Sequence, residues 1–276
     1  MEPPPVTTYA QLVLGPPGSG KTTYCKGMAE YLRGLGRDVA IINLDPAAPS
    51  TPYDATIDVA ALVTTPAVAA THGLGPNGAL IYAFEYLAAN TDWLVAALRP
   101  HRGKYWLFDM PGQVELSTHN DAIRGLLSAL TRGGGVRLAA VNLVDAAHCA
   151  DVGKWVAALL VSITVMFQVE LPIVNVLSKV DLVEAYGGLE NIEQYAEGMD
   201  LEYLVGALDD DPRLTKYAAL NRALVGLVDD YSHVRFQTLS ITSQESVGAL
   251  VKVVDKANGY MFSEMDAAGL MAARVP

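Results

Sequence analysis

Glycine, lysine and threonine residues near the start of the chain have the types and spacing of a phosphate-binding loop. The segment GPPGSGKT at 15–22 fits the pattern G-x4-G-K-T. In such a loop the glycines let backbone N–H groups point at phosphate oxygens, the lysine reaches the β- and γ-phosphates, and the threonine ligates Mg²⁺. We therefore expect a nucleoside triphosphate to bind here. The expected nucleotide-binding residues of the loop are Gly15, Gly18, Ser19, Gly20, Lys21, Thr22 and Thr23.

A second segment, DMPGQVE at 109–115, has the composition of a metal-ordering and water-orienting motif. Asp109 ends an apolar run, where a carboxylate can share the Mg²⁺ shell with Thr22, and the Gly112 N–H can face the γ-phosphate. Gln113 stands where a residue that orients the attacking water is expected. Glu115 has two open interpretations, as a second group that holds this water or as a carboxylate stabilised by a helix N-terminus.

Asp45 follows another apolar run, in the segment NLDPA. A carboxylate at this place can contact the attacking water or a water bound to Mg²⁺, which makes Asp45 a candidate catalytic residue. The alternative is a structural role, in which Asp45 caps the turn before Pro46.

The segment SKVD at 178–181 predicts recognition of guanine. The Asp181 carboxylate can accept hydrogen bonds from both N1–H and the exocyclic amine of guanine, a pair that adenine does not offer. The Lys179 stem would lie against the base while its ammonium stays solvated or binds the phosphate loop. Ser240 would complete the pocket through its backbone N–H. Ser178 has a short side chain, so we expect a looser link to the phosphate loop.

The elements that must position these residues follow from near-continuous apolar runs separated by helical stretches. A helix is expected from about Thr22, with Tyr24, Met28, Leu32 and Leu35 on one face, and 245–257 is expected to form a closing helix. Strands without polar alternation are typical of a parallel sheet covered by helices, and ligands bind at its carboxyl edge. The expected strands are 9–14, 38–45, 105–110, 138–145, 171–178 and 234–240. The stretch 187–230 predicts a helical insertion before the last strand.

Composition limits the other classes of function. The net charge of −11 argues against a broad contact with nucleic acid or an anionic membrane. Two cysteines, Cys25 and Cys149, are too few for a disulfide framework, and the N-terminal MEPPPVTT has no signal-peptide pattern. The apolar stretch 155–169 is too short to span a membrane, and we interpret it as a buried core helix or, alternatively, as an apolar groove for a partner.

The combination of these motifs with Gly75, Pro76 and Asn77 resembles the GPN-loop GTPases, over roughly residues 9–262. The resemblance implies a three-layer P-loop NTPase fold of the SIMIBI type, with a mostly parallel sheet and GTP/GDP and Mg²⁺ as cofactors. It also implies a homodimer, or a heterodimer with a paralogous GPN-loop GTPase, in which the GPN loop reaches the γ-phosphate of the partner's site. The turn at 75–78 would be stiff, and we expect residues 1–8 and 263–276 to be tails.

By resemblance, the family role would be cytoplasmic assembly of RNA polymerase II and its delivery to the nucleus, with polymerase subunits or assembly factors as partners. The sequence shows no identifiable arginine finger, and because a trans arginine is worth about 10³–10⁵ in rate, slow turnover is expected. A kinase for a small molecule or polynucleotide end is the alternative, with 187–230 as a lid. In a third reading, nucleotide state opens an apolar groove at 153–169.

Overall fold

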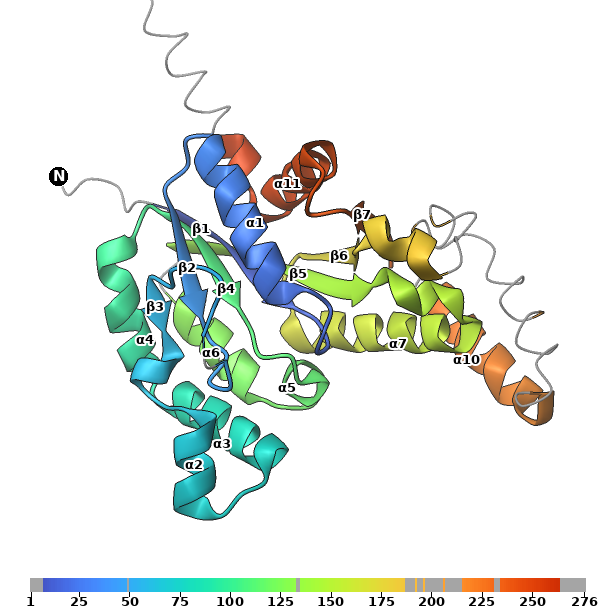
Figure 1. Ribbon diagram of the computed structural model, residues 1–276, viewed down its shortest axis with the longest axis horizontal. Coiled ribbons are helices and arrows are strands. Elements are labelled where there is room, and N and C mark those ends of the chain that lie inside the picture. The colour runs from blue at the N-terminus through green and yellow to red at the C-terminus, as the bar shows by residue number, and fades with distance from the viewer. Residues whose placement is uncertain are drawn as a thin grey trace, which may run out of the picture.

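A parallel β-sheet organises the molecule (Figure 1). The computed structural model describes residues 7–48, 50–132, 135–186, 192, 196, 206, 215–230 and 234–263. Its seven described strands have the order β3-β2-β4-β1-β5-β6-β7, and every neighbouring pair is parallel. The strands are β1 Thr8–Leu14, β2 Val39–Asn43, β3 Ile57–Asp58, β4 Tyr105–Asp109, β5 Val136–Asp145, β6 Ile173–Ser178 and β7 Phe236–Leu239. The six expected strands are confirmed, whereas the two-residue edge strand β3 is too short for its pattern to be recognised.

Helices α1 (Lys21–Gly34) and α11 (Gln244–Asn258) cover one face of the sheet (Figure 1). Tyr24, Met28 and Leu32 are buried on α1, as predicted. Leu35 was expected on the same face but is 55% exposed, because α1 ends at Gly34 and Leu35 follows as its C-cap. The closing helix is confirmed as α11, which Ser243 caps by accepting a hydrogen bond from the Ser246 N–H.

The opposite face is covered mainly by α3, α4, α6 and α7, whose apolar side chains share a core with the sheet. Short helix α5 lies beside α7, and α10 packs against the far end of α7. These helices and α2 span α2 Thr65–His72, α3 Pro76–Ala89, α4 Thr91–Leu98, α5 Val114–Thr118, α6 Ala122–Thr131, α7 Val152–Val169 and α10 Ala218–Asp230. The result is the expected three-layer α/β arrangement.

Helix α7 is longer than the predicted apolar stretch. Its 18 residues are apolar enough to cross a membrane by length and composition alone, and it is the one helix of this kind in the described part of the chain. Trp155 is 1% exposed and packs on Phe236 of β7, with ring centroids 5.1 Å apart. Leu159 and Ile163 join the same core. This packing is that of a core helix and agrees with the first of the two interpretations, and the side around Trp155 is filled in this structure.

Helices α2 and α3 pack against each other at the lower end of the view (Figure 1). Pro76 is the first residue of α3, and Gly75 is its N-cap in an extended conformation. The prediction of a turn at 75–78 is therefore wrong, because proline is favoured at the first position of a helix, where its missing N–H costs nothing. All eight residues 71–78 are exposed.

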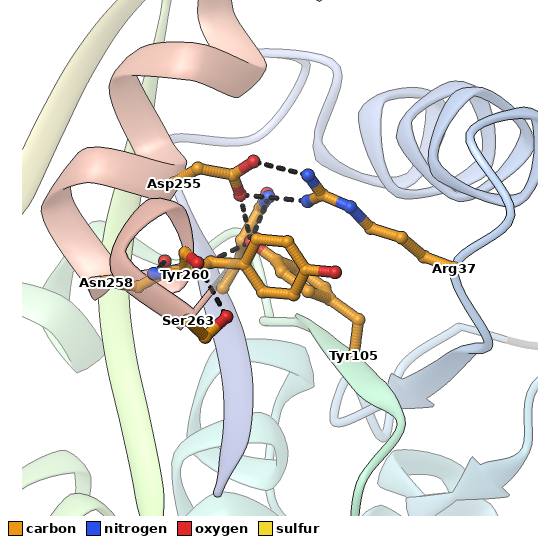
Figure 2. A network of polar contacts seen from close by, with 7 residues as sticks. Arg37, Tyr105, Asp255, Asn258, Tyr260 and Ser263 are labelled. Carbon is orange, nitrogen blue, oxygen red and sulfur yellow. Dashed lines mark hydrogen bonds and ion pairs between the residues drawn. The ribbon is translucent and has the colours of Figure 1, made fainter. Parts of the chain in front are cut away.

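A buried polar network joins Arg37, which follows α1, to α11 at the amino-terminal end of β4 (Figure 2). Arg37 donates to both carboxylate oxygens of Asp255, at 3.0 and 2.6 Å, and its guanidinium lies 3.8 Å from the ring centroid of Tyr260. The Tyr105 hydroxyl accepts a hydrogen bond from Asn258 at 2.7 Å and contacts Asp255 at 3.5 Å. The network thus holds α11 on the sheet.

The predicted insertion and tails fall largely outside the described residues. Within 187–230, the structure describes 192, 196, 206, a short 3-10 turn at Thr215–Tyr217 and α10. At the N-terminus, β1 already begins at Thr8, inside the segment expected as a tail, and its N–H donates to Gly135 O at 2.8 Å. Ser263 is the last described residue.

Candidate functional site

The phosphate loop connects β1 to α1 and depends on glycine for its backbone shape. Gly15 has a φ of 142°, and a Cβ there would lie 2.4 Å from Leu143 O and 2.7 Å from Ser19 Oγ. Gly18 and Gly20 also have positive φ, at 81° and 93°. These left-handed conformations are strained for other residues, so the loop needs its glycines to present its N–H groups at the start of α1.

Lys21 lies folded over the loop that it follows. Its ammonium donates to Gly15 O at 2.9 Å and to Pro16 O at 3.1 Å. The residue is 8% exposed, and burial lowers the pKa of Lys21, against the opposing charges of Asp109 and Asp45. A cation held in this way at a phosphate loop is poised to exchange carbonyl partners for phosphate oxygens.

Asp109, at the end of β4, provides a buried carboxylate next to the loop. It is 2% exposed, and its Oδ2 accepts a hydrogen bond of 2.7 Å from the Tyr53 hydroxyl. The other oxygen, Oδ1, is buried and makes no hydrogen bond of good geometry within the described part of the chain. Burial raises the pKa of Asp109, whereas the Tyr53 and Thr22 hydroxyls and the Lys21 charge act to lower it.

This donor set fits Mg²⁺. A buried carboxylate oxygen without a good partner, close to the Thr22 hydroxyl, offers the hard oxygen ligands that Mg²⁺ takes up beside nucleotide phosphates. Tyr53 is the residue that sequence reasoning missed, because it lies in the connection between β2 and β3 and no motif spacing points to it. Burial and the charge of Asp109 raise the pKa of Tyr53 far above its usual value, so its hydroxyl remains a donor.

Asp45 makes the turn-capping hydrogen bond that its structural alternative predicts. Its Oδ1 accepts from the Ala47 N–H at 2.9 Å, and its own N–H donates to Asn43 Oδ1 at 3.1 Å. Burial raises the pKa of Asp45, while the Ala47 hydrogen bond and the Lys21 charge lower it. Asp45 therefore caps a turn and also contributes negative charge near Lys21.

The segment after β4 runs directly past the phosphate loop. A Cβ at Gly112 would lie 3.0 Å from Lys21 Nζ and 3.1 Å from Pro17 Cα, so only glycine allows this approach. Gln113 is the N-cap of α5, and its Oε1 is buried without a partner in the described residues. Glu115 is exposed in the first turn of α5, the position of a carboxylate stabilised by a helix N-terminus.

The base-recognition segment is tied to the phosphate loop more tightly than expected. Ser178 Oγ donates to Ser19 O at 2.8 Å and contacts Val144 O at 3.2 Å, so the expected loose link is absent. The Lys179 ammonium does not bind the loop: it forms an ion pair of 2.6 Å with Asp145, and the Lys179 side chain is 32% exposed. The register of β5 and β6, which pairs Asp145 with Ser178, brings these two charges together. The Lys179 stem lies over Gly20.

A cavity of about 230 Å³ lies between these two segments and has the place expected of a base pocket. Gly20 and Thr23 of the loop region line it together with Lys179 and the exposed Asp181. Tyr24, Leu239 and Ile241 complete the apolar part of the wall. The Ser240 N–H, predicted to bind guanine, donates instead to Ser246 Oγ at 3.1 Å. This hydrogen bond joins the loop that follows β7 to the first turn of α11.

The structure thus assembles most of the predicted residues at the carboxyl edge of the sheet. Lys21, Thr22, Asp109 and Gly112 surround the loop. Asn77 does not join them: it lies on the exposed tip of the α2–α3 pair, where a Cβ at Gly75 would meet no atom within 4 Å.

The protein has a three-layer α/β fold, a G-x4-G-K-T loop between the first strand and the first helix, and an aspartate at a strand end beside that loop. These features define a P-loop nucleoside triphosphatase. The comparisons with known proteins narrow this class. A family model described as "Conserved hypothetical ATP binding protein" matches residues 13–260. GPN-loop GTPase QQT1 of Arabidopsis thaliana is 48% identical over 261 residues, which cover 94% of this chain and 88% of that protein.

GPN-loop GTPase 2 of Danio rerio is also 48% identical, over 98% of this chain and 86% of its own length, and the Saccharomyces cerevisiae protein of that name is 34% identical over 95% and 77%. The apo form of a GTPase from Pyrococcus abyssi has the same fold, with a TM-score of 0.72, 24% identity and coverage of 90% of this chain and 97% of that one. The chain belongs to the GPN-loop GTPase family.

Proposed function

We propose that this GTPase is a Mg²⁺-dependent dimeric switch. The observation that carries the proposal is the Asp109 carboxylate, which is buried beside the phosphate loop and close to the Thr22 hydroxyl. Its Oδ1 has no hydrogen-bond partner of good geometry among the described residues. When bound, Mg²⁺ would neutralise charge on the β- and γ-phosphate oxygens. Thr22 and Asp109 would hold the ion, the loop N–H groups would bind the phosphates, and Lys21 would exchange its carbonyl partners for phosphate oxygens.

Gln113 is the residue we propose to orient the attacking water. Its buried Oε1 has no partner among the described residues, so it can accept a hydrogen bond from a water that enters the site. The adjacent Gly112 brings its backbone against Lys21 and so close to the expected γ-phosphate. Replacing Gln113 by Ala should slow single-turnover hydrolysis while GTP binding stays within about threefold, because the side chain would act only in the chemical step.

The base pocket favours guanine, although the matched family model is described by ATP. Asp181 lines the cavity beside Lys179, where its carboxylate can accept from both N–H groups of guanine. Asp181→Asn should weaken GTP binding by at least about 100-fold, because the variant offers one acceptor and one donor instead of two acceptors. Unchanged GTP binding together with phosphate transfer from ATP to an acceptor would favour the kinase alternative instead; family membership favours hydrolysis.

The GPN tip supports a dimer in which each subunit completes the site of the other. Asn77 is exposed at the start of a proline-initiated helix and makes no contact with its own phosphate loop in the structure. A rigid helix start holds the amide in place across an interface better than a flexible loop would. Light scattering after size exclusion, with GDP and with a GTP analogue, tests this idea. A nucleotide-independent monomer that hydrolyses GTP at full rate, with Asn77→Ala as active as the wild type, would overturn it.

The cellular part of the proposal rests on family resemblance. We propose a cytoplasmic protein that shuttles to the nucleus, pairs with itself or a paralogous GPN-loop GTPase, and assists assembly and nuclear import of RNA polymerase II. Replacing the endogenous protein by Lys21→Ala should leave polymerase subunits in the cytoplasm, since the variant lacks the cation of the phosphate loop. Normal nuclear polymerase in such cells would contradict this role.

A further inference from the structure

We propose that Tyr53 is a positioning residue of the metal site, whose hydroxyl fixes one oxygen of Asp109 and leaves the other oxygen to the metal shell. The inference rests on the proposed Mg²⁺ dependence and adds to it a residue that no motif contains. It is carried by the 2.7 Å hydrogen bond from Tyr53 to Asp109 Oδ2, together with the buried Oδ1 on the other side of the same carboxylate.

The position of the Tyr53 ring is itself determined by its surroundings. The ring packs against the core between α1 and the sheet, so the hydroxyl reaches Asp109 from the protein side. The Thr51 hydroxyl donates to Tyr53 O at 2.7 Å, and the Thr56 N–H donates to Ile41 O at 2.8 Å. The connection from β2 to β3 is therefore anchored on both sides of Tyr53, and the hydroxyl is held in place before any ligand arrives.

The carboxylate needs such a partner because its strand does not fix the orientation of its two oxygens. The backbone of Asp109 is held by its neighbours, with Asp109 O accepting from the Leu44 N–H at 2.9 Å, but rotation about the last side-chain bond remains. A hydrogen bond to Oδ2 selects one rotamer and one free oxygen. Carboxylate ligands in metal sites are themselves hydrogen-bonded, and losing that partner typically costs 10–100-fold in metal affinity.

Lys21, the other charged group of the site, is also held in place by hydrogen bonds. Lys21 is held by the carbonyls of Gly15 and Pro16, at 2.9 and 3.1 Å. These two contacts use two of the three N–H donors of the ammonium, so at least one carbonyl must be given up if Lys21 is to reach both the β- and the γ-phosphate. Tyr53 need not leave Asp109, because a carboxylate has a second oxygen. The tyrosine therefore acts in both the free and the loaded protein.

The test is the Mg²⁺ dependence of GDP binding in Tyr53→Phe, which removes only the hydroxyl. A fluorescent GDP analogue is titrated with the full-length protein in EDTA and at a series of Mg²⁺ concentrations. We expect the Mg²⁺ concentration for half-maximal effect to rise at least about 10-fold. The GDP affinity in EDTA should stay within twofold of the wild type, because no metal is then present for Asp109 to bind. Tyr9→Phe is the matched control, because Tyr9 lies near the start of β1 and the phosphate loop follows the end of that strand. The Tyr9 hydroxyl makes no hydrogen bond with the described residues.

The outcomes separate this inference from the proposed function. If GDP binding by the wild type ignores Mg²⁺, the proposed metal dependence fails, and the role of Tyr53 fails with it. If the wild type responds to Mg²⁺ and Tyr53→Phe matches it, only the positioning role is overturned. A variant that loses affinity equally in EDTA and in Mg²⁺, or melts well below Tyr9→Phe without ligand, shows a general structural role and also overturns the inference.

Discussion

Replacing Asp255 by asparagine tests how the fold supports the site without touching it. The carboxylate pairs with Arg37 in a buried network between α1 and α11, with side-chain exposures of 9% and 10% (Figure 2). The two hydrogen bonds of 3.0 and 2.6 Å make this a bidentate ion pair. Asparagine keeps the shape but removes the charge, so the Arg37 guanidinium loses its ion pair with Asp255.

The cost follows from the burial of the pair. Breaking a buried ion pair by removing one charge typically costs about 3–5 kcal/mol. We expect a value near the lower end, about 3 kcal/mol, because the guanidinium keeps its contact with the Tyr260 ring at 3.8 Å. For a domain of this size the loss corresponds to a melting temperature lower by about 6–12 °C. Replacing both partners, as Arg37→Met with Asp255→Leu, should restore most of the stability, because no uncompensated charge remains.

The assay is thermal and urea unfolding of Asp255→Asn, of Arg37→Met and Asp255→Leu as single variants, and of the double variant. The GDP affinity is measured in parallel at 25 °C. The GDP affinity should change by less than twofold, because the network contacts the amino-terminal end of β4, whereas the phosphate loop follows the carboxyl end of the parallel strand β1. Two results would refute the reasoning. One is a double variant as unstable as the sum of its single variants. The other is an unchanged melting temperature combined with a fivefold or larger loss of GDP affinity. That result would mean that the network acts on the site through Gln11, which donates to the Tyr105 hydroxyl at 3.0 Å and accepts from the Tyr24 hydroxyl at 2.7 Å.

Three further changes probe the site itself. Gly15→Ala should abolish tight GTP binding and lower the free energy of unfolding by about 1–3 kcal/mol, because its Cβ would lie 2.4 Å from Leu143 O. The control Gly125→Ala, whose Cβ would meet no atom within 4 Å, should instead stabilise α6 by about 0.5–1 kcal/mol. Equal unfolding curves of the two variants would contradict this expectation. Ser178→Ala should weaken GDP binding and cost about 1–3 kcal/mol, since Ser19 O loses its donor; wild-type affinity and stability would oppose this link. Burial raises the pKa of Asp109, so between the pKa of the unfolded chain and that of the native protein the native carboxyl keeps a proton that the unfolded chain releases. The free energy of unfolding without nucleotide therefore falls as the pH rises through this range. Asp109→Asn should flatten that slope and weaken Mg²⁺-dependent GDP binding, and an unchanged pH profile of unfolding would contradict the assignment.

Much of the fold was predictable because parallel strands buried on both faces leave a clear apolar signal. The runs around 9–14 and 105–110 became β1 and β4, three of the four residues predicted on one face of α1 are buried, and the closing helix formed as α11. The start of α3 at Pro76 was not predicted, since proline and glycine favour a turn as well as the first residues of a helix. Local sequence alone does not choose between these two.

The sequence by itself determined the chemistry of the phosphate loop, because G-x4-G-K-T and the strand-end Asp109 act through local backbone geometry and residue type. Only the tertiary structure decided which partners the charged groups take. Lys179 pairs with Asp145 through the register of β5 and β6, the Ser240 N–H is used by Ser246, and Tyr53 reaches Asp109 from 56 positions earlier in the chain. Such contacts depend on which strands and loops lie next to each other in space, and the spacing of residues within a motif does not determine this.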